Sequence, residues 1–95
     1  MKHFEIIANE RLTANPEVER LTQAVVMAED KDAAIARFIE WASESYEMTA
    51  MDYYDDNTLL EGTRAYYEAL KMEAVEISEM RYSFLSRRYF GQKNL

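Results

Sequence analysis

The stretch that decides the fold is "LTQAVVMAEDKDAAIARFIEWA", Leu21 to Ala42. Its first nine residues are rich in apolar and β-branched side chains, which favours a strand. The acidic run "EDKD" follows, in which Asp30 fits a helix N-cap and Asp32 suits the positive end of the helix dipole. Apolar residues then recur at the spacing of one buried helical face: Ile35, Phe38, Ile39 and Ala42. The stretch therefore predicts a strand, a cap and a helix, in that order.

The flanking segments predict two further strands. "KHFEIIA" (Lys2–Ala8) alternates between apolar and mixed positions and precedes a ten-residue connection that contains Asn15 and Pro16. This connection would join the first two strands as a hairpin. "EMTAMDYY" (Glu47–Tyr54) alternates in the same way and is the predicted third strand.

The segment from Thr58 to about Phe90 predicts a long helix, whose apolar stripe consists of Tyr66, Leu70, Ala74, Ile77 and Phe84. Unbroken, it would be roughly 48 Å long, which exceeds the dimensions of a 95-residue globule. We therefore expect a break near Gly62 or near "SEMRYS" (Ser78–Ser83), or else a projecting end. Asp55, Asp56 or Asn57 can cap the start of this helix.

Together these elements predict an α+β fold, in which a three-stranded antiparallel sheet packs on two helices in the order ββαβα, the C-terminal helix being long. An all-α helical bundle is the alternative, because Asn15, Pro16 and Glu17 also suit a helix start and Val18, Leu21, Val25 and Ala28 fall near helical spacing. The presence of only two glycines also favours helices. Leu21 to Glu29 is thus the segment on which the two hypotheses differ.

The bulk properties indicate one compact domain over residues 1–95, with residues 91–95 as a frayed tail after Gly91 ends the last helix. The chain contains no cysteine, which excludes a disulfide framework and a thiolate zinc site. Its apolar runs are far shorter than the roughly 18 residues that a membrane helix needs. We therefore expect a cytoplasmic protein that does not bind membranes.

Charge is distributed unevenly along the chain, whose net charge is −7. All eighteen acidic residues lie at or before Glu79, whereas the last sixteen residues carry four basic side chains: Arg81, Arg87, Arg88 and Lys93. Between Phe38 and Thr63 there are seven carboxylates and no Lys or Arg. A field of this sign repels nucleic acid and accelerates encounter with a basic partner. We therefore predict no direct binding of nucleic acid.

The residues that usually carry catalysis or bind metals do not form a recognisable pattern. An EF-hand loop beginning at Asp52 would need an oxygen ligand, a glycine and a glutamate where this chain has Tyr54, Asn57 and Thr63. A nonstandard cation site using Asp52, Asp55 and Asp56 is the remaining alternative. The only histidine, His3, lacks a second imidazole, and two glycines cannot build a phosphate-binding loop. We expect no enzyme activity, no cofactor and no metal.

Tyrosine and carboxylate side chains concentrate between Phe38 and Thr63, a stretch that we call the acidic window. Tyrosine anchors interfaces because it offers a large contact area at low rotamer cost, and carboxylates beside it select for arginine and lysine on a partner. A basic protein partner is therefore expected, most naturally one whose basic surface binds nucleic acid. The predicted partner-binding residues are Glu40, Glu44, Glu47, Asp52, Tyr53, Tyr54, Asp55, Asp56 and Glu61.

In length, charge, absence of cysteine and the window "ESYEMTAMDYYDDNTLLEG", the chain resembles small acidic phage-encoded anti-defence proteins, of the anti-CRISPR or anti-restriction type. The resemblance is at the level of the class and includes no diagnostic motif. It implies stoichiometric inhibition of a host nuclease or CRISPR surveillance complex, with carboxylates standing in for phosphates. The basic tail departs from the pattern of a pure DNA mimic.

A self-assembling structural or regulatory protein is the alternative function. In that hypothesis the basic C-terminal helix of one chain docks on the acidic window of the next, and a homodimer is the simplest product. Such an assembly would loosen as salt is raised.

Overall fold

Strand β1 (Lys2–Asn9) and strand β2 (Arg20–Ala28) pair in antiparallel fashion, which confirms the predicted hairpin and shows that the all-helical alternative is wrong. The computed structural model describes residues 1–9, 20–50, 55–88 and 93–95, without the side chains of 45–50, 56, 88 and 93. Phe4, Ile6 and Ala8 are buried on one face of β1, as the alternation predicted. Leu21 to Glu29 is therefore strand over nearly its whole length.

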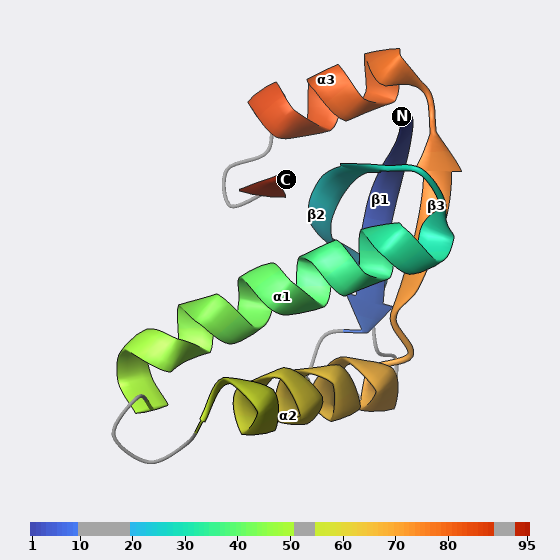
Figure 1. Cartoon of the computed structure of the whole chain (residues 1–95). Helices are drawn as coiled ribbons and strands as arrows, with labels where there is room; N and C mark the ends of the chain where they lie inside the picture. The colour runs from blue at the N-terminus through green and yellow to red at the C-terminus, as the bar shows by residue number, and fades with distance from the viewer. Residues whose placement is uncertain (10–19, 51–54, 89–92) are drawn as a thin grey trace.

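Helix α1 (Lys31–Ala50) begins where the sequence placed its cap. The Asp30 carboxylate accepts a hydrogen bond from the Ala33 backbone N–H at 2.8 Å, which satisfies one of the donors that a helix start leaves unpaired. Phe38, Ile39 and Ala42 are buried against the sheet, as predicted, and Ile35 is half-buried. In Figure 1, α1 runs diagonally across one face of the sheet.

The predicted third strand over Glu47–Tyr54 is wrong. Met48 to Ala50 form the last turn of α1, and residues 51–54 lie outside the described residues. The free edge of β1 is instead taken by β3 (Glu73–Ile77), which pairs antiparallel with it from His3 opposite Ile77 to Ile7 opposite Glu73. The fold class is confirmed: three antiparallel strands form one open sheet in a small α+β domain, with β3 later in the chain than expected.

The long helix predicted from Thr58 to about Phe90 is divided into α2 (Asp56–Ala69) and α3 (Glu79–Arg88) by β3. Gly62 lies within α2, so the first predicted position of the break is wrong. The break runs from Leu70 to Ser78. It overlaps the second predicted position, Ser78–Ser83, only at Ser78. Lys71 adopts a left-handed backbone conformation, with φ 57°, which ends the helical path after α2.

The two faces of the sheet carry different layers (Figure 1). α1 covers the face that bears Phe4, Ile6 and Val26, and α2 packs on α1. α3 covers part of the opposite face, where Tyr82 and Leu85 pack on Val25. β4 (Lys93–Asn94) then pairs parallel with β2, giving the strand order β3-β1-β2-β4.

Residues 93–95 belong to the sheet, in contrast to the frayed tail predicted over 91–95. The Leu95 N–H donates to the Val25 carbonyl at 2.8 Å, and the Met27 N–H donates to the Leu95 carbonyl at 3.1 Å. Leu95 also packs against the main core. Residues 91 and 92, including the predicted cap Gly91, lie outside the described residues.

Candidate functional site

The helical hairpin formed by α1 and α2 carries most of the acidic residues that the sequence singled out. The Phe38 ring of α1 meets the Tyr67 ring of α2 edge-on, with the centroids 4.9 Å apart, and meets the Trp41 ring at 5.8 Å. Aromatic contacts of this kind fix the two helices against each other. In Figure 1 the connected end of the hairpin extends beyond the sheet.

Small polar side chains of the hairpin bond to its own backbone. The Ser43 hydroxyl donates to the Glu40 carbonyl at 2.8 Å, and the Thr63 hydroxyl donates to the Leu59 carbonyl at 2.7 Å. Both residues are buried. These hydroxyls are therefore satisfied within the helices and serve the packing of the hairpin.

Asp55 is the N-cap of α2, which selects one of the three candidates that the sequence allowed. Its carboxylate accepts a hydrogen bond from the Thr58 backbone N–H at 2.7 Å. The hydrogen bond from the Thr58 backbone, followed by that from the Thr58 side chain, lowers the pKa of Asp55 from its ordinary value of 3.8. Asp55 is exposed and stays charged at neutral pH.

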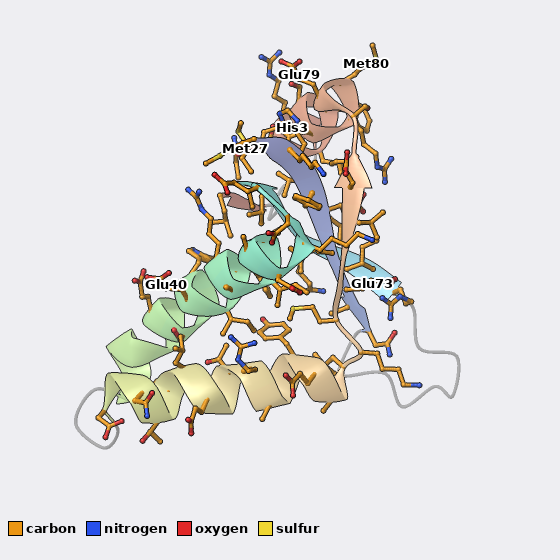
Figure 2. All side chains as sticks on the ribbon, turned by 45° about the vertical axis from the view of Figure 1, so that its right-hand side comes forward. His3, Met27, Glu40, Glu73, Glu79 and Met80 are labelled. Atoms are coloured by element: carbon orange, nitrogen blue, oxygen red, sulfur yellow. The ribbon has the colours of Figure 1, made fainter. Side chains whose placement is uncertain are left out.

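The exposed carboxylates of Glu40, Glu44, Asp55 and Glu61 are the described part of the predicted surface, and we call these four residues the acidic hairpin. Glu40 and Glu44 are one helical turn apart, about 6 Å along α1, so they share its outer face. Asp55 caps the start of α2, and Glu61 lies in the first half of that helix. Figure 2 shows Glu40 pointing away from the sheet. The fold thus brings onto one structural unit charges that are 21 residues apart in sequence.

The other predicted site residues are not described in the same detail. Glu47 and Asp56 are helical in α1 and α2, but their side chains lie outside the described residues. Asp52, Tyr53 and Tyr54 lie outside the described residues altogether. Their part in a contact surface stays a prediction.

The basic residues that flank the acidic window differ in their contacts. Arg37, one turn before Glu40, directs its guanidinium Nη1 to the Met27 carbonyl of β2 at 3.4 Å. Arg64, on the third turn of α2, is exposed. The acidic hairpin is therefore bordered by Arg37 on the side of the sheet and by Arg64 along α2.

Sequence reasoning missed an ion pair with a buried carboxylate on the other face of the sheet. Glu5 is only 4% exposed, and its carboxylate accepts hydrogen bonds from the Arg81 Nε of α3 at 2.9 Å and from the Thr22 hydroxyl of β2. A β-bulge at Gln23 shifts the register, so that Thr22 stands opposite Ile7 and faces Glu5. Glu5 and Arg81 are 76 residues apart, and no spacing rule connects them.

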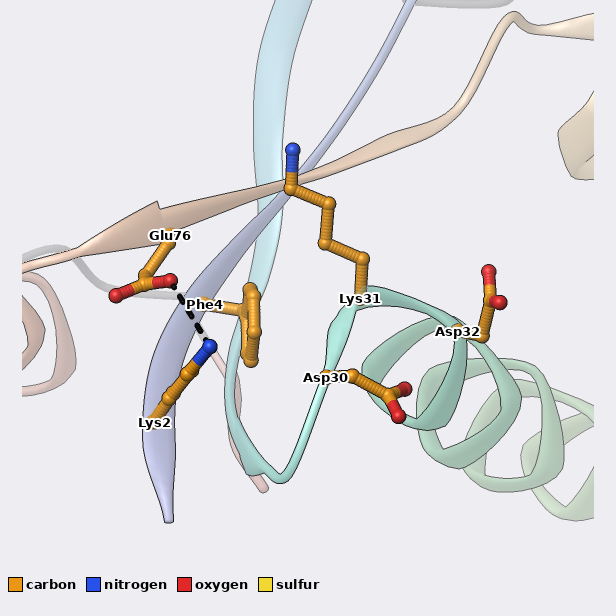
Figure 3. A pocket seen from close by; sticks show the side chains of 6 residues that line it. All are labelled: Lys2, Phe4, Asp30, Lys31, Asp32 and Glu76. Atoms are coloured by element: carbon orange, nitrogen blue, oxygen red, sulfur yellow. Dashed lines mark ion pairs between the residues drawn. The ribbon is translucent and has the colours of Figure 1, made fainter.

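A depression of about 470 Å³ opens beside the start of α1 (Figure 3) and is lined by Lys2, Phe4, Asp30, Lys31, Asp32 and Glu76. Lys2 and Glu76 form an ion pair at 3.8 Å, and Asp30 is engaged as the helix cap. The charges are of mixed sign, so they do not converge on a ligand of one kind. Across the ranges that the structure describes, no three His, Asp or Glu side chains are grouped so as to hold a metal ion.

None of the described helices combines the length and the apolar character required to cross a membrane. Comparison of the chain with family models, curated proteins and solved structures found no match.

Proposed function

We propose that the protein is a non-enzymatic inhibitor that binds a basic, nucleic-acid-binding surface of a host defence protein or complex through its acidic hairpin. The observation that carries this proposal is the run from Phe38 to Thr63, which has seven carboxylates and no Lys or Arg and whose described residues lie on α1, on α2 and at the α2 cap. A basic groove that binds phosphates is the surface most complementary to such an array.

The packing of the hairpin supports this proposal. The ring contact between Phe38 and Tyr67 holds α1 against α2, and Asp55 caps α2. Carboxylates carried on two packed helices require less ordering of the backbone on binding than carboxylates on a loop. A single exposed ion pair contributes only about 0 to 1 kcal/mol, so several carboxylates must act together.

The class of partner follows from charge and from the resemblance to anti-defence proteins. A nuclease or a CRISPR surveillance complex presents a basic channel to its nucleic acid, and a bound acidic hairpin would occupy that channel. The inhibitor acts stoichiometrically and needs no cofactor. We place its action in the cytoplasm, which suits a chain without cysteine.

The experiment is a titration against a panel of purified restriction nucleases and CRISPR effector complexes, with DNA cleavage as the readout. We expect one member to lose activity in linear proportion to added protein, with an endpoint at a fixed molar ratio. Excess DNA added before the protein should weaken the inhibition, because both compete for one basic surface. Inhibition that is complete at a small fraction of the nuclease concentration would indicate turnover and contradict the proposal, as would the absence of inhibition across the panel.

A further inference from the structure

Strand β3 lies at the edge of the sheet. In the order β3-β1-β2-β4 it pairs with β1 on one side, and none of the described residues pairs with its other side. In Figure 1 this outer edge forms the right-hand border of the molecule. An edge strand presents a row of backbone N–H and C=O groups to which another strand can add.

β3 is short and carries two glutamates, but it lacks the other features that usually protect an edge strand from pairing. Its sequence, "EAVEI", contains no proline and no lysine, and its pairing with β1 runs without a bulge. Val75, at its centre, is 37% exposed. The charges of its two glutamates are compensated within the chain, by Arg20 at 2.7 Å from Glu73 and by Lys2 at 3.8 Å from Glu76.

We propose that two copies of this chain associate through β3, antiparallel and two-fold symmetric, with Val75 opposite Val75 of the second copy. This register uses all five residues of the strand. Glu73 then stands opposite Ile77 of the second copy, and Ala74 opposite Glu76, so no carboxylate faces another. Opposed side chains in an antiparallel pair lie on the same face.

Charge and length together favour this register over its neighbours. In a two-fold antiparallel pair one residue faces its own counterpart, so the register can shift only in steps of two residues. A shift toward the end of the strand opposes the two Glu76 side chains and brings like charges together. A shift toward its start opposes the two Ala74 side chains and pairs only Glu73 to Val75 of the strand.

The dimer has a consequence for the acidic hairpin. Because opposed residues share a face, both copies carry α1 and α2 on the same side of one continuous sheet with six antiparallel strands. Two acidic hairpins are thus presented together to one partner. Bivalent presentation raises the apparent affinity without new contacts at either hairpin.

The test uses the absence of cysteine, which makes single-cysteine variants unambiguous. In the proposed register the two residues at position 75 have Cα atoms about 4.5 to 5.5 Å apart, within the range that a disulfide spans. Val75→Cys should therefore form a covalent dimer on mild oxidation. Glu73→Cys is the matched control, because the two residues at position 73 are four positions out of register and should stay unlinked.

Sedimentation equilibrium of the wild-type chain without any partner completes the experiment. We expect a reversible dimer, and we expect Val75→Lys to sediment as a monomer with an unchanged circular dichroism spectrum. A wild-type chain that sediments as a monomer at every concentration up to its solubility overturns the proposal. Cross-linking of Glu73→Cys as efficient as that of Val75→Cys overturns the register. Neither outcome affects the proposed inhibition, which is measured with the nuclease present.

Discussion

At the scale of single residues, Asp55 has a structural role that must be separated from its role in the predicted surface. It caps α2 through the Thr58 N–H and is also one of the exposed carboxylates of the acidic hairpin. Asparagine caps a helix about as well as aspartate but carries no charge, whereas alanine neither caps the helix nor carries a charge. The two substitutions therefore distinguish folding from binding.

We predict that Asp55→Asn keeps the melting temperature of the wild type and that Asp55→Ala lowers it, because only alanine leaves the Thr58 N–H without its acceptor. Thermal unfolding followed by circular dichroism measures both. Equal melting temperatures for the two variants would show that the cap does not stabilise the fold.

The same cap predicts the direction of a pH effect. Since the folded pKa of Asp55 is lowered, the charged carboxylate stabilises the folded state above its ordinary pKa of 3.8, and this contribution is lost as pH falls through the folded pKa. The melting temperature of the wild type should therefore fall more steeply than that of Asp55→Asn below pH 3.8. Parallel pH profiles for the two proteins would contradict this prediction.

A second residue-scale prediction concerns Glu5 and Arg81. Arg81→Met removes the cation from a carboxylate that is almost fully buried, and we expect a loss of about 1 to 3 kcal/mol in the free energy of unfolding. Because the Arg81 side chain is 53% exposed, this loss should be smaller than for a fully buried pair. Chemical denaturation measures it. The double variant Glu5→Leu, Arg81→Met should recover part of the loss, and a single variant as stable as the wild type would show that the pair is energetically neutral.

At the scale of elements, β1, β2 and the first part of α1 were predictable because each local pattern agrees with the fold. The strand alternation of Phe4 and Ile6, the Asp30 cap and the helical spacing of Phe38 and Ala42 all lead to the same structure. β3 was not predictable in the same way. Leu70, Ala74 and Ile77 fit a helical stripe, and only pairing with the free edge of β1 makes this segment a strand. Helix length signalled that a break was needed but did not place it.

The acidic hairpin was predictable in part for a related reason. The helical face that buries Phe38, Ile39 and Ala42 leaves Glu40 and Glu44 on the outside, so their exposure follows from periodicity alone. That Asp55 and Glu61 share a unit with them depends on how α2 turns back onto α1, which is a long-range contact. The contact between Phe38 and Tyr67 that fixes this arrangement has no signature in the local sequence.

The element-scale prediction concerns the attachment of α3 to β4. Tyr82 is buried, and its hydroxyl donates to the Asn94 side chain of β4. Burial raises the pKa of Tyr82 above its ordinary value of 10.0, with the positive charge of Arg37 acting in the opposite direction. A raised pKa means that the neutral side chain stabilises the folded state, fully below pH 10.0 and less as pH rises through the folded pKa.

Tyr82→Phe should accordingly remove a contribution above pH 10.0 from the alkaline titration of tyrosinate absorbance and make stability less dependent on pH above 10.0. A difference between the wild-type and variant titration curves that is centred at or below pH 10.0 would contradict this assignment of Tyr82.

At the scale of the whole molecule, charge and topology are arranged together. The acidic hairpin lies on α1 and α2, whereas α3, with exposed Arg81 and Arg87, lies at the other end of the sheet, where Figure 2 shows Glu79 and Met80. In the self-assembly alternative, the basic helix of one chain docks on the acidic residues of the next. Arg81 of that helix is already paired with Glu5 in its own chain, so less positive charge is available for this contact. Pairing through β3 needs no such contact and leaves the acidic hairpin available.

The central claim is that the carboxylates of the acidic hairpin make the contact with a basic partner. The most direct measurement compares the affinity of two variants for the nuclease that the panel identifies. One variant removes three of the four charges of the acidic hairpin, as Glu40→Gln, Glu44→Gln and Glu61→Gln, and keeps the Asp55 cap. The control removes the same charge from exposed residues outside the four of the acidic hairpin, as Glu29→Gln, Asp32→Asn and Glu68→Gln; Glu29 and Asp32 lie at or just before the start of α1 and Glu68 near the end of α2, away from the connected end of the hairpin. We predict a roughly 10- to 100-fold weaker affinity for the hairpin variant, at about 1 kcal/mol or less for each ion pair, and a change within about three-fold for the control. Equal losses in the two variants would mean that net charge alone governs binding, and an unchanged affinity of the hairpin variant would contradict the claim outright.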